Sequence, residues 1–212
     1  RYLANFCENR KDLPQISIKK IVDGKIIEDL TIEEDDIPVP DIEQPLNVYY
    51  SKLDKHNSII RSEKKETLTL KSFKLPIENL DKNELILVSK GELASKIKLD
   101  SIQPTENIDG NRYLFLLSGN YIDSRDSDTR GKIDIVKTKD FKKRDNSGMF
   151  KEEEILLEDI ENKTNKTIIK LYDEIRKLNE VKEQNITELQ KMFLLNPQTV
   201  DALRKKISAN DS

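Results

Sequence analysis

The feature that most constrains the fold is a change in the spacing of apolar residues near position 151. Beyond it, apolar residues recur every three to five positions with Glu and Lys between them, which is typical of amphipathic helices. These residues are Ile155, Ile160, Ile168, Leu171, Tyr172, Ile175, Leu178, Val181, Ile186, Leu189, Met192 and Phe193. Before it, apolar residues tend to alternate with polar ones, as in half-buried strands. The sequence therefore predicts an α+β fold, with a strand-rich domain over residues 1–150 and a helical extension over 151–212.

Turn residues divide the strand-rich part. Asp23-Gly24 predicts a tight hairpin between strands at 15–22 and 25–32. Further strands are expected at 46–52, 66–76 and 84–90, and the most hydrophobic stretch, 113–117, predicts a central strand. The segment 33–45 is expected to be irregular because its three prolines cannot donate to a sheet ladder. Residues 52–66 are expected to form a loop or a short helical turn, and 92–100 to begin a short helix. We expect a mixed or antiparallel sheet backed by helices.

The helical part is expected to break within residues 161–167, because that polar stretch carries no apolar anchor. A first helix of about two turns, at 3.6 residues per turn, would then precede a longer second one. Asn196-Pro197 places an N-cap before a proline at the first helical position, which predicts a last helix over 197–207. Residues 1–9 resemble the last turns of an amphipathic helix, which indicates a chain cut from a longer polypeptide.

The charge balance excludes several function classes. With 37 basic and 40 acidic side chains, the net charge of -3 gives no global attraction to nucleic acid or anionic lipid. No apolar run reaches the roughly 20 residues of a membrane span, so a cytoplasmic protein is expected. Cys7 and His56 are the only residues of their types, which argues against an internal disulfide, a conventional zinc site and a Ser-His-Asp or Cys-His hydrolase. No metal site is predicted, His56 is expected to be solvated, and Cys7 to act as a small buried apolar residue.

The informative phrase follows the predicted central strand. Gly119 ends the strand, and acidic residues and two arginines, Arg125 and Arg130, follow before apolar alternation resumes at Ile133. A guanidinium on such a loop can contact a phosphate in bidentate fashion, as arginine does at a transferring γ-phosphoryl group. Alternatively, the arginines pair with nearby carboxylates on the surface. A calcium loop is a third interpretation, although the glycine and the distal Glu of a helix-loop-helix calcium site are absent.

In this order the residues YLFLLSGNYIDSRDSDTR, 113–130, resemble the middle domain of GHKL ATPases, the family of gyrase and the ninety-kilodalton heat-shock chaperones. The resemblance implies a transducer with a ribosomal-protein-type fold, in which Gly119, Asp123, Ser124 and Asp126 shape the loop. It also implies that Arg130 contacts the γ-phosphate of ATP. Because the spacer after Asp126 is shorter here than in the chaperones, Arg125 is the other candidate.

The same resemblance implies partners and cofactors. ATP and Mg would be held by the protein's own N-terminal ATP-binding domain, and the helices would relay the nucleotide state to a homodimer partner or a client. The catalytic Glu and metal-binding Asn helix, the Asp-x-Gly-x-Gly turn and the glycine-rich lid of that domain do not occur in these 212 residues. The chain alone is therefore not expected to hydrolyse ATP.

Two other functions stay open. The chain is alternatively a non-enzymatic protein-interaction module that presents a helical hairpin, or self-associates through the apolar stripe at 168–193. A third interpretation is a nucleic-acid-binding domain that uses the basic run at 139–145, although Phe141 is its one aromatic residue and a solvated turn explains the run as well.

Overall fold

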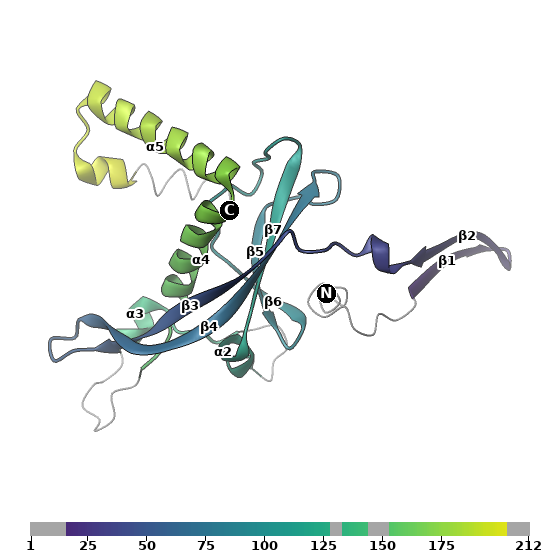
Figure 1. Ribbon diagram of the computed structural model, residues 1–212, viewed down its shortest axis with the longest axis horizontal. Coiled ribbons are helices and arrows are strands. Elements are labelled where there is room, and N and C mark those ends of the chain that lie inside the picture. The colour runs from purple at the N-terminus through teal and green to yellow at the C-terminus, as the bar shows by residue number, and fades with distance from the viewer. Residues whose placement is uncertain (1–15, 128–132, 144–152, 203–212) are drawn as a thin grey trace.

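The computed structural model describes residues 16–127, 133–143 and 153–202. At its N-terminal end, β1 (Ile16–Val22) and β2 (Lys25–Ile32) form a separate two-stranded antiparallel sheet. Both turn residues, Asp23 and Gly24, have positive φ, which is the geometry of a type I′ turn, so the predicted hairpin is confirmed. Figure 1 shows this hairpin standing apart from the rest of the molecule.

The main sheet has five strands in the order β3-β4-β7-β5-β6. They are β3 (Ile42–Leu53), β4 (Ile59–Pro76), β5 (Glu84–Ser89), β6 (Glu92–Ile97) and β7 (Asn111–Ser118), and a single turn of 3-10 helix (Glu34–Asp36) precedes them. Only the β5–β7 pair is parallel. The expected α+β class with a mixed sheet is therefore confirmed, and β7 lies at its centre as the apolar run predicts.

Strand β7, at the centre of the sheet, is covered on both of its faces. Tyr113, Phe115 and Leu117 point into the larger core, while Leu116 joins a smaller core on the opposite face. The Tyr113 ring stacks on Phe115 with centroids 6.1 Å apart. A strand buried on both faces reads as a continuous apolar run, which explains why this segment was the clearest strand signal in the sequence.

The helices cover the larger core. Short helices α2 (Asn120–Ser124) and α3 (Thr138–Phe141) precede α4 (Leu157–Leu171) and α5 (Asp173–Phe193), and α5 leaves α4 at an angle (Figure 1). Residues 197–202 are also helical, and Asn196 Oδ1 accepts the Thr199 N–H at 2.8 Å as the predicted N-cap. Among the described residues, no helix has the length and apolar character needed to cross a membrane.

Three predictions for segments of the strand-rich part differ from the structure. Pro45 lies within β3 because β3 is an edge strand, where a missing N–H need not interrupt the ladder. The segment 52–66, expected to be a loop or a short helical turn, is irregular only at residues 54–58, and its remaining residues belong to β3 and β4. In the turn, Asp54 Oδ1 accepts the N–H groups of His56 and Ser58, both at 2.8 Å. The expected helix at 92–100 is strand β6, which follows a tight turn at Lys90-Gly91 with positive φ at both residues.

The expected break at 161–167 was also wrong. Helix α4 runs through this stretch to Leu171, because buried polar side chains anchor it where apolar ones are missing. Asn165 Oδ1 accepts the N–H groups of Asp100 and Ser101 at 2.7 and 2.9 Å, and its Nδ2 donates to the carbonyl of Lys98 at 3.0 Å. Satisfied polar contacts of this kind hold a helix on its domain as packing does.

Candidate functional site

Gly119 is the residue that turns the chain from β7 into α2. Its φ of 154° lies in a region that side-chain-bearing residues rarely adopt, and a Cβ there would lie 2.9 Å from Leu68 Cδ2 and 3.2 Å from the Thr67 carbonyl oxygen. Glycine is therefore needed both for the backbone conformation and for the close approach to β4. We call residues 119–126 the loop phrase.

The acidic residues of the loop phrase hold the neighbouring β5–β6 turn. Asp123 Oδ1 accepts the Lys90 N–H at 2.8 Å, and Asp126 Oδ2 accepts from Ser89 Oγ at 3.2 Å and lies 3.6 Å from Lys90 Nζ. Ser124 Oγ donates to the Tyr121 carbonyl at 2.7 Å and so closes α2. These carboxylates are spread along a turn, and the described residues include no cluster of three His, Cys, Asp or Glu side chains that could hold a metal.

Arg125 points into the domain. Its Nη2 lies 2.5 Å from Glu154 Oε2, and its guanidinium carbon lies 5.0 Å from the centre of the Tyr121 ring. The Arg125 side chain is 31% exposed and that of Glu154 only 10%. Burial raises the pKa of Tyr121 to about 12, so its hydroxyl stays protonated and donates to the Ile155 carbonyl at 3.1 Å.

Glu154 ties this ion pair to the sheet. Its N–H and carbonyl both pair with Ser51 of β3, at 3.0 and 2.7 Å. The loop phrase is therefore joined, through Arg125 and Glu154, to the segment that leads into α4. Arg130 and Asp128 lie outside the described residues, and so does Cys7.

The remaining candidates from the sequence have local roles. His56 is exposed in the β3–β4 turn. In the basic run, Phe141 is 1% exposed and packs with Leu53 and Leu156, so it anchors α3 instead of facing solvent as a base-stacking platform would. The last two residues of that run, 144 and 145, lie outside the described part.

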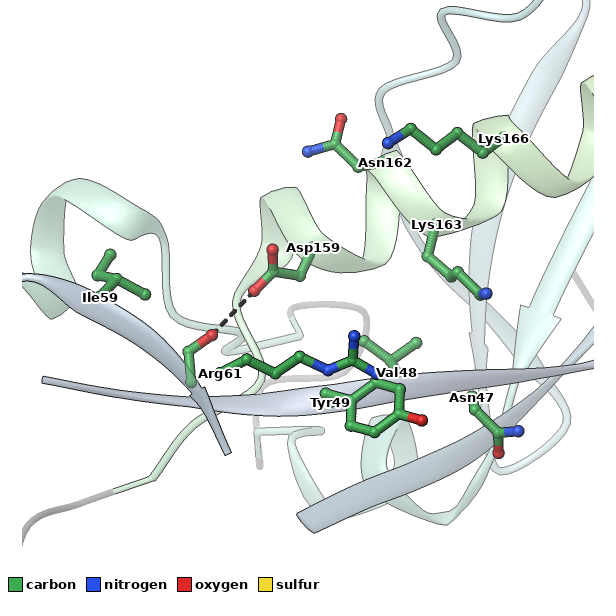
Figure 2. Close-up of a pocket in the computed structure, with 10 residues that line it drawn as sticks. Asn47, Val48, Tyr49, Ile59, Arg61, Asp159, Asn162, Lys163 and Lys166 are labelled. Atoms are coloured by element: carbon green, nitrogen blue, oxygen red, sulfur yellow. Dashed lines mark hydrogen bonds between the residues drawn. The ribbon is translucent and has the colours of Figure 1, made fainter. Parts of the chain in front are cut away.

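A second site, which the sequence analysis missed, is a pocket of about 400 Å³ between the β3–β4 hairpin and α4. Figure 2 shows Lys163 reaching from α4 toward the strands, with Arg61 lying across Tyr49 below it. The Arg61 guanidinium carbon is 3.2 Å from the centre of the Tyr49 ring. Lys166 lies one turn further along α4. We call this the cationic pocket.

The charges of the cationic pocket are open to a ligand. Among the described residues that line it, the one carboxylate is that of Asp159, which accepts a hydrogen bond from Ser51 Oγ at 3.1 Å. Within the described part of the chain, Arg61, Lys163 and Lys166 form no ion pair with any carboxylate. Three cations against one carboxylate give the described lining of the pocket a formal charge of +2.

The sequence held one unused signal for this pocket. Ile160 and Ile168 are eight residues apart, which fits two helical turns, so a continuous helix would have placed Lys163 and Lys166 on one exposed face. The placement of Arg61 beside these lysines, and likewise the pairing of Arg125 with Glu154, depends on the packing of segments far apart in the sequence.

No protein-family model, curated protein or solved structure matches this chain.

Proposed function

We propose that this chain is the transducer of a GHKL-type ATPase, which meets ATP bound to a separate domain and passes the nucleotide state to its helices. The observation that supports the proposal is the Arg125–Glu154 ion pair at 2.5 Å, which joins the loop phrase to the start of the helical part. A displacement of the loop phrase by a neighbouring domain would therefore act directly on the segment before α4.

The two arginines take different roles in this proposal. Arg125 is committed to Glu154 and transmits, while Arg130 is the γ-phosphate contact implied by the family resemblance. Coupling of this kind requires two arrangements that bind the nucleotide with different affinity. ATP and Mg belong to the separate domain, and a dimer partner or client would receive the signal.

The proposal is tested in the full-length protein. Arg130→Ala should lower the rate of ATP hydrolysis at least tenfold, which corresponds to about 1.4 kcal/mol, and leave nucleotide affinity unchanged because the contact forms in the closed state. Lys170→Gln, a charge loss on an exposed part of α4, is the control. An unchanged rate in both Arg130→Ala and Arg125→Ala contradicts the proposal, as does an upstream coding sequence without the Glu/Asn helix and the Asp-x-Gly-x-Gly turn.

A specific observation favours the second candidate, a protein-interaction module. The end of α5 carries exposed apolar side chains, with Phe193 at 65% and Met192 at 75% exposure. On this proposal a second copy of the chain packs there. Sedimentation velocity should then show a dimer for the wild type and a monomer for Met192→Ser/Phe193→Ser. A wild-type protein that stays monomeric at concentrations up to about 100 μM contradicts this candidate, because a moderately stable dimer has a micromolar dissociation constant.

A further inference from the structure

We propose that the cationic pocket binds the phosphate group of a small phosphorylated molecule. The site involves none of the residues of the loop phrase, so the inference is independent of the proposed transducer role. It starts from three cations that line one hollow, Arg61 from β4 and Lys163 and Lys166 from α4.

The arrangement differs from an ordinary solvated helix face. Lys163 and Lys166 are three positions apart on α4 and therefore neighbours, so their charges repel each other. Glu161 is the nearest acid on the C-terminal side of Asp159, and its side chain accepts the Lys98 N–H at 2.9 Å and is turned away from the pocket. Asp159, four positions before Lys163, offsets part of this charge, and an anion in the pocket would offset the rest.

The chemistry of Arg61 favours a phosphate. Its guanidinium carbon lies 3.2 Å from the centre of the Tyr49 ring, as in the stacking of arginine on an aromatic side chain. A planar guanidinium can contact two oxygens of one phosphate, while the lysines act as point charges. A phosphate monoester carries a charge of about -1.5 to -2 at neutral pH, which matches the formal charge of +2 around the pocket.

The shape of the pocket favours a small molecule. Its volume of about 400 Å³ lies within the range of roughly 300–1,000 Å³ typical of small-ligand sites. Besides the cations, the wall offers apolar surface from the half-buried Ile59 and the exposed amide of Asn162, which can contact the uncharged part of the ligand.

The test is isothermal titration calorimetry of this chain with inorganic phosphate, inorganic pyrophosphate and adenosine monophosphate as probes. At least one probe should bind, and Lys163→Gln/Lys166→Gln should weaken that binding at least tenfold. Both lysines are exposed, so the variant should keep its fold. Arg61→Lys keeps the charge but removes the planar fork, and should weaken binding several-fold.

Lys170→Gln is the matched control, because it removes the same charge from an exposed position of the same helix outside the pocket. It should change the affinity by less than twofold. The proposal is overturned if none of the three probes binds, or if Lys170→Gln weakens binding as much as the double variant. It is also overturned if a single-stranded DNA oligonucleotide binds tightly and loses affinity equally with every charge removed, which is the signature of a nucleic-acid surface.

Discussion

The loop phrase and the cationic pocket both gather charged side chains, but they use them differently. In the loop phrase, Asp123, Arg125 and Asp126 each have a partner inside the domain. In the pocket, Arg61, Lys163 and Lys166 have no carboxylate partner among the described residues. The comparison teaches that a charged cluster that stands out in the sequence can serve to hold the fold together. A cluster that sequence analysis misses can instead keep its charges available for a ligand. Removing a charge should cost stability in the first region and little stability in the second.

The largest effect should come from Gly119→Ala. The backbone strain at φ 154° and the overlap with Leu68 together should lower the free energy of unfolding by about 4 kcal/mol. Gly110→Ala is the control, because Gly110 also has positive φ but no atom within 4 Å of the added Cβ, and should lose only about 1 kcal/mol. Urea denaturation measures both losses. Equal losses in the two variants would show that the close approach of Gly119 to β4 does not contribute to stability.

Asn165→Ala extends the comparison along α4. It leaves the N–H groups of Asp100 and Ser101 without their acceptor, which should lower the free energy of unfolding by about 3 kcal/mol. Asn162→Ala removes the same amide from the exposed pocket side of the helix and should stay within about 0.5 kcal/mol of the wild type. Thermal or urea unfolding measures both losses. Similar losses in the two variants would contradict the difference proposed between the buried amide of Asn165 and the exposed amide of Asn162.

Glu154→Gln tests the ion pair itself. It removes the charge that faces the partly buried Arg125 guanidinium and should lower the free energy of unfolding by about 2 kcal/mol. The Lys163→Gln/Lys166→Gln variant, measured alongside, should lose less than about 0.5 kcal/mol although it removes two charges. If the pocket variant is the less stable of the two, the pocket lysines stabilise the fold more than the Arg125–Glu154 ion pair does, which contradicts the comparison.

A pH titration sharpens the comparison through Glu174 of α5. Its own backbone N–H, together with Lys74 and Tyr113, holds the pKa of this carboxyl below its ordinary value of 4.5. A carboxyl with a lowered folded pKa stabilises the fold above the unfolded pKa, and this contribution disappears as pH falls through the folded value. The stability difference between wild type and Glu174→Gln should therefore be largest above about pH 4.5 and shrink toward pH 3. A difference that is constant with pH would contradict the interaction.

The smallest effect should be a gain. Lys166→Glu replaces a like-charge neighbour of Lys163 with an opposite one and should raise the free energy of unfolding by about 0.3 kcal/mol at low salt. The same variant should lose the binding of the phosphate probes. A loss of stability instead would show that Lys166 has a structural role.

Much of the fold could be predicted because local signals coincided with tertiary structure. The Asp23-Gly24 turn and the apolar run of β7 were clear, and Asn196 was correctly placed as an N-cap. The errors came where a partner distant in sequence decided the local structure. Asn165 anchors α4 through residues 98–101, and residues 92–97 form β6 because they pair with β5 across the Lys90-Gly91 turn. For the same reason, local sequence patterns could not predict that Arg125 pairs with Glu154 or that the three cations line one pocket.

The separate hairpin of β1 and β2 has a consequence for handling the protein. Two strands alone bury little: Ile18 and Leu30 are 58% and 60% exposed, and no other strand of the described residues pairs with the outer edges of the ribbon. Such an edge invites strand addition from another chain and, at high concentration, fibrillar growth. The exposed ion pairs of Lys19 with Asp29 and Lys20 with Glu28 place charges along this ribbon, and charged side chains of this kind oppose such growth.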